Sequence, residues 1–334
     1  MRASLRLNND LPPGHYAVLA RAAERHGFDQ LWISHDLFLR SAPILAMCAL
    51  QATEHLQIGT GVMNPHTVHP AELAMLAATL DEVSGGRFNL GLGAGAADFR
   101  AWVGLDDRTP VATMRETLAA VRGWLAGTPV PAGRFVREPA AAYLRFRPRR
   151  VTPIYLGAMG PAMLRLAGEL ADGALPLLFP PEHWRTVQPL LEAGARRRAA
   201  ALGPLDAAAC VWVSLDEDAA AARRALADKI AYYGHALGPL IYERLGVARA
   251  EFAPIQRAVT VDRDPARARA MVDARMLAIG VAGGPTEIVE RLLPLVAEGV
   301  DHVSFGPPLG PDPLRAVELL GREVLPALRA AAAP

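Results

Sequence analysis

Polar side chains that can carry acid–base and anion chemistry lie at the ends of two strand-like runs. The segment "WISHDLF" places His35 and Asp36 directly after one run, and Arg6 lies near the end of the first run, "ASLRL". A histidine titrates near neutrality and can donate a hydrogen bond or a proton, whereas an arginine stays charged and binds anions. We therefore predict His35, Asp36 and Arg6 as catalytic residues. The alternatives are a helix cap by Asp36 with His35 at the rim, and an internal ion pair of Arg6 with Asp10 or Asp36.

The segment "IGTGVMNPHTVHP", residues 58–70, ends a strand-like run in glycines and a polar turn. Gly61 is either an ordinary β-turn residue or part of a bulge that presents its backbone to a ligand. His66 and His69 have H-x-x-H spacing, but no third ligand is evident, and zinc sites use three or four protein ligands. We therefore predict no metal site.

The loops after two later runs are also rich in glycine. "GLGAG", residues 91–95, lacks the full G-x-G-x-x-G pattern, so its glycines either let the backbone approach a ligand or permit tight packing. In "LGAMGPAML", residues 156–164, Gly160 and Pro161 open a predicted helix whose first N–H groups can bind an anion. The alternative is simple punctuation between a strand and a helix.

Eight short apolar runs are each followed by a helical pattern. This alternation favours a parallel sheet, and eight units predict an α/β fold, a (β/α)8 TIM barrel, with its chemistry at the carboxyl ends of the strands. A single domain, 1–334, would carry insertions after strand 4 (a hairpin in 128–151) and after strand 7 (helices in about 216–283). A doubly wound open sheet with a helical cap is the alternative. The predicted strands are 3–7, 29–34, 56–61, 87–93, 152–157, 173–178, 207–214 and 302–306.

The composition is that of an ordinary globular protein. The formal net charge is +1, so no basic excess directs the chain to nucleic acid or an anionic membrane. The sequence has no apolar run of about 18 residues and no secretory h-region, and two cysteines provide no disulfide framework. We expect a cytoplasmic protein whose partner is a small molecule. Lys229, the only lysine, is expected to be solvated.

Four segments, spread over nearly the whole chain, resemble the luciferase-like flavin and deazaflavin oxidoreductases, and among them the methylenetetrahydromethanopterin reductases. They are 27–38, 56–95, 152–177 and 298–328. The resemblance implies a flavin or 5-deazaflavin ring in the barrel mouth, a non-proline cis peptide at Gly61-Val62 behind that ring, and a homodimer. It also implies the cofactor-binding residues Thr60, Gly61, Val62, Asn64, Gly93, Gly157, Ala158, Met159 and Gly160.

One position departs from the pattern of those reductases. They present a glutamate from the first strand for reduction of the pterin, and Arg6 stands in its place here. An arginine cannot act as a general acid at neutral pH, but it can orient a carboxylate or a phosphate. We therefore predict an oxidoreductase that uses a 5-deazaflavin, coenzyme F(420), to transfer hydride to or from a small organic substrate. The alternatives are a monooxygenase that uses reduced FMN and oxygen, and a non-catalytic flavin-binding protein.

Overall fold

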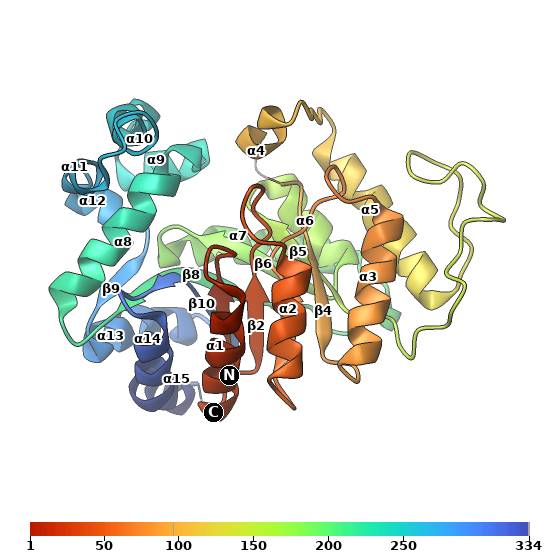
Figure 1. Ribbon diagram of the computed structural model, residues 1–334, viewed down its shortest axis with the longest axis horizontal. Helices are drawn as coiled ribbons and strands as arrows, with labels where there is room; N and C mark the ends of the chain where they lie inside the picture. Colours follow the sequence, from red (N-terminus) through yellow and green to blue (C-terminus); the bar gives the residue numbers. More distant parts are fainter. Residues whose placement is uncertain (96, 333–334) are drawn as a thin grey trace.

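The protein is a closed barrel of eight parallel strands surrounded by helices, as the computed structural model describes for residues 1–95 and 97–332 (Figure 1). Neighbouring strands follow the order β6-β5-β4-β3-β2-β1-β10-β8, and β6 pairs with β8 to close the ring. The predicted TIM barrel is confirmed, and the open sheet is not formed. The barrel strands are β1 (Arg2–Leu7), β2 (Gln30–Ile33), β3 (Gln57–Thr60), β4 (Phe88–Leu92), β5 (Ile154–Ala158), β6 (Gly173–Leu178), β8 (Ala209–Leu215) and β10 (His302–Leu309).

Two short strands extend the ring, and helices cover it. β7 (Asp206–Ala207) pairs with β6, and β9 (Val281–Gly283) pairs with β8. Many of the helices begin with proline, which lacks the N–H that a first-turn residue leaves unpaired. No described helix is long and apolar enough to cross a membrane. The covering helices are α1 (Pro13–Arg25), α2 (Ala42–Gln51), α3 (Pro70–Val83), α4 (Ala97–Trp102), α5 (Pro110–Ala126), α6 (Pro161–Leu170), α7 (Trp184–Ala195), α13 (Pro285–Ala297), α14 (Pro313–Leu319) and α15 (Leu325–Ala331).

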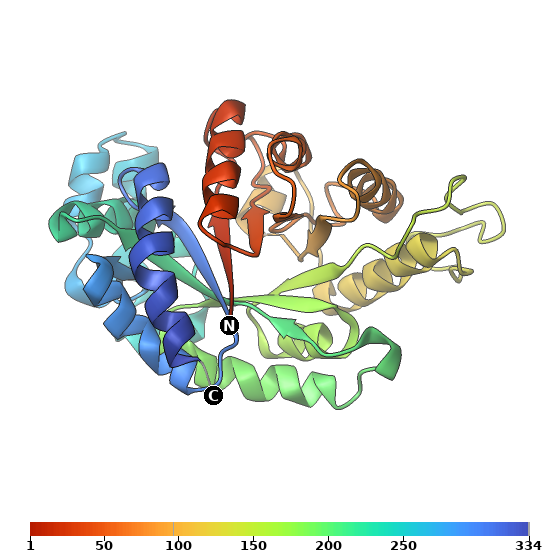
Figure 2. The same cartoon turned by 90° about the horizontal axis from the view of Figure 1, so that it is seen from below.

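The insertion after strand 4 does not form the predicted hairpin. Residues 128–151 run as turns and bends, and they extend away from the barrel beside α5 (Figure 2). Pro131, Pro139 and Pro148 have no N–H to donate, so the alternating pattern of this segment cannot build a strand ladder. The end of the insertion is attached to α3, where Arg150 Nη2 lies 2.7 Å from Asp81 Oδ1.

The insertion after strand 7 is helical, as predicted, and builds a second apolar cluster beside the barrel. Leu226 and Ile230 of α8 pack in this cluster with Phe252 of α10, and Trp212 of β8 belongs to it as well. The cluster therefore fixes α8 beside the end of β8, where the barrel opens (Figure 1). The helices are α8 (Ala219–Tyr233), α9 (Pro239–Leu245), α10 (Phe252–Thr260), α11 (Pro265–Ala270) and α12 (Ala274–Leu277).

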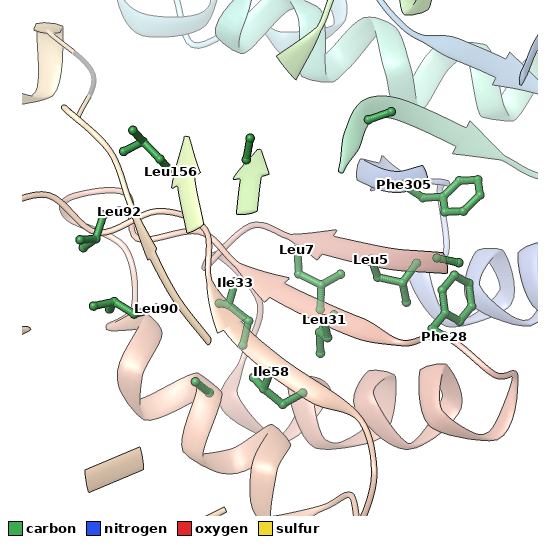
Figure 3. Packing of buried hydrophobic residues seen from close by; sticks show 14 of the residues in the cluster. Leu5, Leu7, Phe28, Leu31, Ile33, Ile58, Leu90, Leu92, Leu156 and Phe305 are labelled. Carbon is green, nitrogen blue, oxygen red and sulfur yellow. The ribbon is translucent and has the colours of Figure 1, made fainter. Parts of the chain in front are cut away.

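Alternation along the strands divides side chains between two environments. Leu5, Leu31, Ile33 and Ile58 belong to the large apolar core between the strands and the helices, and each is fully buried (Figure 3). Burial of each such side chain contributes about 1.5–3 kcal/mol, so this layer supplies much of the stability. The intervening residues of each strand face the barrel interior, which is where polar residues and glycines accumulate.

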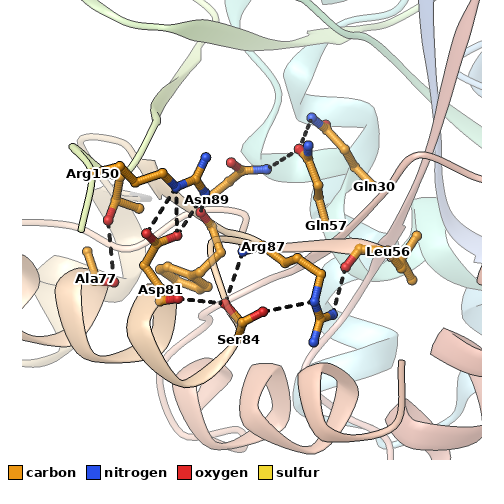
Figure 4. A network of polar contacts seen from close by, with 11 residues as sticks. Gln30, Leu56, Gln57, Ala77, Asp81, Ser84, Arg87, Asn89 and Arg150 are labelled. Atoms are coloured by element: carbon orange, nitrogen blue, oxygen red, sulfur yellow. Dashed lines mark hydrogen bonds and ion pairs between the residues drawn. The ribbon is translucent and has the colours of Figure 1, made fainter. Parts of the chain in front are cut away.

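Polar side chains fill the amino-terminal end of the barrel interior. Gln30 Nε2 donates to Gln57 Oε1 at 3.2 Å, and Asn89 Nδ2 donates to the same oxygen at 2.9 Å (Figure 4). Gln30 Nε2 also lies 3.1 Å from the hydroxyl oxygen of Tyr155. Buried polar groups are tolerated when they find such partners, so this end of the barrel is closed by a connected network.

A buried Ser–His–Asp chain continues this network. His302 Nε2 lies 2.9 Å from Ser4 Oγ, and His302 Nδ1 lies 2.8 Å from Asp206 Oδ1. The same three groups form a nucleophilic relay in hydrolases, but Ser4 and His302 are fully buried and no substrate can reach the hydroxyl. Burial raises the pKa of Asp206, but its hydrogen bond to His302 and the charges of His302 and Arg2 outweigh that effect and lower the pKa to about 2. The chain is therefore a structural ion-pair network.

The low pKa of Asp206 makes a prediction about acid stability. Because this pKa lies below that of the unfolded chain, its stabilising contribution is complete above about pH 4 and is lost as the pH falls toward 2. We expect Asp206→Asn to lower the free energy of unfolding by about 2 kcal/mol at pH 7 and by about half as much near pH 3. Urea denaturation at both pH values checks this, with exposed Asp301→Asn as the control. An equal deficit at both pH values would contradict it.

Candidate active site

Strand β3 ends in a backbone bulge, and the peptide bond between Gly61 and Val62 is cis. The bulge is attached on both sides. Gly61 N–H donates to the carbonyl of Ile33 at the end of β2, at 2.7 Å, and the carbonyl of Met63 accepts from Gly93 N–H, just past β4, at 2.9 Å. The predicted cis peptide and bulge are therefore confirmed, and a plain β-turn is not what the chain forms here.

Glycines of two neighbouring strands leave space for Val62. A Cβ at Gly93 would lie 2.7 Å from Val62 Cγ2, and a Cβ at Gly157 would lie 2.9 Å from Val62 Cγ1. Gly59 packs against Trp32 in the same way, since a Cβ there would lie 2.2 Å from the indole. A side chain at any of these three positions would displace its neighbour, so close approach explains the glycines that line this wall of the barrel mouth.

Two of the predicted cofactor-binding residues shape the bulge with their side chains. Thr60 is fully buried, and its hydroxyl donates to Gly91 O and accepts from Gly91 N–H, both at 3.1 Å. Asn64 Oδ1 accepts from the N–H groups of His66 and Thr67, at 3.1 and 3.0 Å, and so forms the turn after the bulge. Both side chains form hydrogen bonds with the backbone, and in this way they stabilise the bulge and the turn after it.

The end of β5 leads into a helix with an open amino terminus. Gly157 is half-buried, Ala158 is buried, and the Met159 side chain is 40% exposed at the rim. Gly160 is the N-cap of α6, which begins at Pro161, and no side chain caps this helix end. The first N–H groups of α6 therefore receive no side-chain cap, and anion binding at this helix end stays a prediction.

The predicted pair His35 and Asp36 lies at the end of β2, and the two side chains take different partners. His35 Nδ1 accepts from the N–H of Ala42, the first residue of α2, at 3.2 Å. Burial lowers the pKa of His35, although the charge of Asp36 opposes this. Because Nδ1 is an acceptor, the ring proton sits on Nε2, and neutral His35 can donate a hydrogen bond from that atom. The alternative of a helix cap by Asp36 is not formed, since its carboxylate instead accepts a hydrogen bond from the hydroxyl of Tyr233.

Asn9, which lies just past the end of β1, fixes the loop that carries this pair. It is fully buried, and its Nδ2 donates to the carbonyl oxygens of Asp36 and Arg40 at 3.0 and 2.6 Å. Its Oδ1 accepts from Asp36 N–H at 3.3 Å. The Asn9 side chain thus provides the hydrogen bonds that a neighbouring strand would otherwise make to residues 36–40. It also fixes the backbone that carries the Asp36 carboxylate.

The expectation that Lys229 is solvated is wrong, because this residue is only 9% exposed. Its Nζ donates to Asn8 Oδ1 at 3.0 Å and lies 3.8 Å from the centroid of the Tyr233 ring. Burial lowers the pKa of Lys229 to about 7, although the charges of Asp36 and Asp10 oppose this; Arg6 has a smaller effect in the same direction as burial. The helical spacing holds a signal for this burial, since Leu226 and Tyr233 lie three residues before and four after Lys229 on the same face of α8.

Arg6 points into the barrel from β1, and Gly306 of β10 makes room for it. A Cβ at Gly306 would lie 2.1 Å from Arg6 Nη2. The only hydrogen bond of this guanidinium in the described part of the chain runs from Nη2 to Val211 O, at 3.3 Å. Neither ion pair considered for Arg6, with Asp10 or with Asp36, is formed.

The two histidines with H-x-x-H spacing take separate roles. His69 Nδ1 accepts from Ala71 N–H at 3.1 Å and caps α3, whereas His66 Nε2 lies 3.1 Å from Asp107 Oδ2. Among the described residues, no group of three His, Cys, Asp or Glu side chains is arranged to hold a metal ion.

Comparison with known proteins adds to this geometry. Residues 4–302 match the luciferase-like monooxygenase family. The chain belongs to that family. A related member is the 5,10-methylenetetrahydromethanopterin reductase of Methanolobus tindarius, 35% identical over 93% of this chain and 94% of the relative. The F(420)-dependent glucose-6-phosphate dehydrogenase of Nakamurella multipartita is 32% identical over 95% of this chain and 93% of the relative.

A solved structure supports the same relationship. The coenzyme F(420)-dependent tetrahydromethanopterin reductase from Methanopyrus kandleri matches this luciferase-like protein with a TM-score of 0.87 at 30% identity. The match covers 98% of this chain and 99% of that chain. The likeness therefore extends over the barrel and both insertions.

The role of Asn9 in this family member can be tested by hydrogen exchange. Asn9→Ala removes three hydrogen bonds to the backbone of half-buried Asp36 and exposed Arg40 in the 36–40 loop. We expect the amides of residues 35–40 to exchange about tenfold faster, while those of the outward strand residues stay protected. Mass spectrometry of deuterated peptides measures this, with Thr79→Ala on the exposed face of α3 as the control. Unchanged exchange in Asn9→Ala would show that the loop is held by other contacts.

Proposed function

We propose that this protein is an oxidoreductase that uses coenzyme F(420) and transfers hydride between the deazaflavin ring and a small organic substrate. The observation that carries the proposal is the bulge at Gly61-Val62. Its Val62 side chain packs against a glycine wall formed by Gly93, just past β4, and Gly157 of β5. Its support from sequence is the similarity, over more than nine-tenths of the chain, to relatives named as F(420)-dependent enzymes.

The residues of the barrel mouth fit a flat ring with an anionic tail. Val62 and the glycines at 93 and 157 form a smooth wall, because no side chain projects from the two glycines. The uncapped amino terminus of α6, after Gly160, offers N–H groups to a phosphate. Val62 would back the ring, and the first turn of α6 would hold the phosphate of the tail.

The bound deazaflavin supplies a carbon that carries hydride. The chain itself must orient the substrate and handle the proton that accompanies hydride transfer. His35, with its proton on Nε2, is a hydrogen-bond donor there, and the Asp36 carboxylate is held by the Tyr233 hydroxyl at the same end of the barrel. Asn9 fixes the loop of both residues, so their positions are set before the substrate arrives.

Arg6 distinguishes this protein from the methylenetetrahydromethanopterin reductases. Some relatives are named 5,10-methylenetetrahydromethanopterin reductases, but Arg6 stays charged and cannot protonate a pterin as a glutamic acid can. Burial does lower the pKa of Arg6, with the nearby Cys210 opposing it, yet a guanidinium remains cationic at neutral pH. We therefore propose a substrate other than the pterin.

Titration of the apo-protein with coenzyme F(420) and with FMN tests the proposed function. We expect F(420) to bind with a change in its absorbance, and FMN to bind at least tenfold more weakly. The second measurement is oxygen consumption with reduced FMN, which we expect to stay at the background rate. Tight FMN binding with oxygen turnover, and no binding of F(420), would make the protein a flavin monooxygenase instead.

The glycine wall gives a sharper prediction. Gly93→Ala places a methyl group 2.7 Å from Val62 Cγ2, so it must displace the bulge that would back the ring. We expect the Kd for F(420) to rise at least tenfold while the circular dichroism spectrum stays unchanged. The matched control is Gly14→Ala, whose added methyl group meets nothing within 4 Å. Equal affinity in both variants would mean that the ring does not rest on Val62.

A further inference from the structure

Two cations at the mouth of the barrel have no carboxylate partner. Within the described residues, Arg6 makes one long hydrogen bond, to Val211 O at 3.3 Å, and its buried Nε has no partner. Lys229 Nζ makes one hydrogen bond, to Asn8 Oδ1, and otherwise lies against the rings of Tyr233 and Trp212. In the described part of the chain, neither cation has an aspartate or glutamate within ion-pair distance.

The two cations lie on the same side of the barrel. Arg6 lies near the carboxyl end of β1, and Asn8 directly follows that strand, so the two residues are about 7 Å apart along the chain. Lys229 bonds to Asn8 and so lies next to that strand end. Asp36, whose charge acts on Lys229, already accepts a hydrogen bond from Tyr233. Asp36 and Asp10 are near enough to raise the pKa of Lys229, but within the described residues neither forms an ion pair with Lys229 or Arg6.

Unmatched buried charge is costly, and a ligand anion relieves it. An uncompensated buried cation destabilises a protein, whereas a charge-assisted hydrogen bond to an anion is among the strongest polar contacts. Arg6 can offer its Nε and a second N–H to two oxygens of one group, and Lys229 retains two donors after bonding to Asn8. This set of donors matches a carboxylate or a phosphate.

We propose that Arg6 and Lys229, with Asn8 beside them, bind an anionic group of the substrate, a carboxylate or a phosphate. The inference deepens the proposed function, on which it rests, because it names the class of molecule that exchanges hydride. The group bound is that of the substrate and not of the cofactor. In the ring of eight strands β1 lies opposite β5, and β5 leads to the helix end that suits the cofactor phosphate.

Thermal unfolding of the apo-protein tests the anion site without the cofactor. Inorganic phosphate and glycolate are added separately, at an ionic strength held constant with sodium chloride. We expect one or both to raise the Tm of the native protein in a saturable way, and the stronger of the two identifies phosphate or carboxylate as the favoured group. No saturable effect of either probe would overturn the proposal.

Variants separate this site from general anion effects. Lys229→Met and Arg6→Met remove one basic group each, and the Tm of each variant without a probe is the baseline for its response. We expect their apparent affinity for the effective probe to fall at least tenfold. Arg224→Met, which removes an exposed cation from the same helix as Lys229, should respond like the native protein. An equal response in all three variants would overturn the proposal.

Proton uptake provides a readout that a purely structural lysine would not give. Asp36, Asp10, Arg6 and Tyr233 are the charged or titratable groups around Lys229, and an arriving anion adds negative charge to this set. Lys229 should then take up a proton near pH 8, measurable by calorimetry of probe binding in buffers of different ionisation enthalpy. We expect no uptake in Lys229→Met. Uptake that persists in this variant would assign the proton to another group.

Competition with the coenzyme distinguishes this inference from the proposed function. We expect the affinity for F(420) to be the same with and without a saturating probe, because the two anions occupy opposite sides of the barrel. A probe that displaces F(420) would assign the anion site to the cofactor and overturn the proposal. Binding of the probe by Arg6 and Lys229 without any binding of F(420) would refute the proposed function and leave the anion site in place.

Discussion

The hydrogen bonds that Met63 makes to β4 hold the bulge of β3, and the candidate site depends on them. Met63 N–H donates to Gly91 O at 2.8 Å, and its carbonyl accepts from Gly93 N–H. With Gly61 bonded to β2 on the other side, the chain can turn inward only at Val62. Every neighbour that faces Val62 must then be small, which is why glycine occupies the facing positions on β4 and β5.

The two ends of the barrel differ in how fully their buried polar groups are hydrogen-bonded. At the amino-terminal end, Ser4, His302 and Asp206 satisfy one another, and the result is a closed, stabilising network. At the carboxyl end, Arg6 Nε has no hydrogen-bond partner among the described residues, which costs stability. Satisfied polar groups build the scaffold, whereas unsatisfied ones are available to a ligand.

The barrel and the insertion after strand 7 contribute different parts of the candidate site. The bulge, the glycine wall and the start of α6 come from the barrel units and form the side suited to a cofactor. Lys229 and Tyr233 come from α8, which belongs to the insertion after strand 7 and packs on its own apolar cluster. An insertion of this kind can change the substrate contacts of the site while the barrel keeps the cofactor side unchanged.

The sequence by itself determined the local elements and much of the cofactor side. Apolar periodicity, helix-starting prolines and glycine stops depend on neighbours a few residues away, so the eight strands and most helices could be predicted near their observed bounds. The similarity of 56–95 to a known family located the bulge, although not the backbone roles of Thr60 and Asn64. The predicted hairpin in 128–151 is wrong because the alternating pattern takes no account of the prolines, which have no N–H to donate to a strand ladder.

Only the tertiary structure decided which polar side chains are buried and what they meet. Lys229 and Asn8 are 221 residues apart, and Ser4 and His302 are 298 residues apart. No local pattern encodes such contacts, because closure of the barrel brings its first and last strands together only after all eight units have packed. The solvated lysine expected from the sequence is therefore a buried cation at the mouth, and the pairing of Asp36 with Tyr233 rather than with a helix end has the same long-range origin.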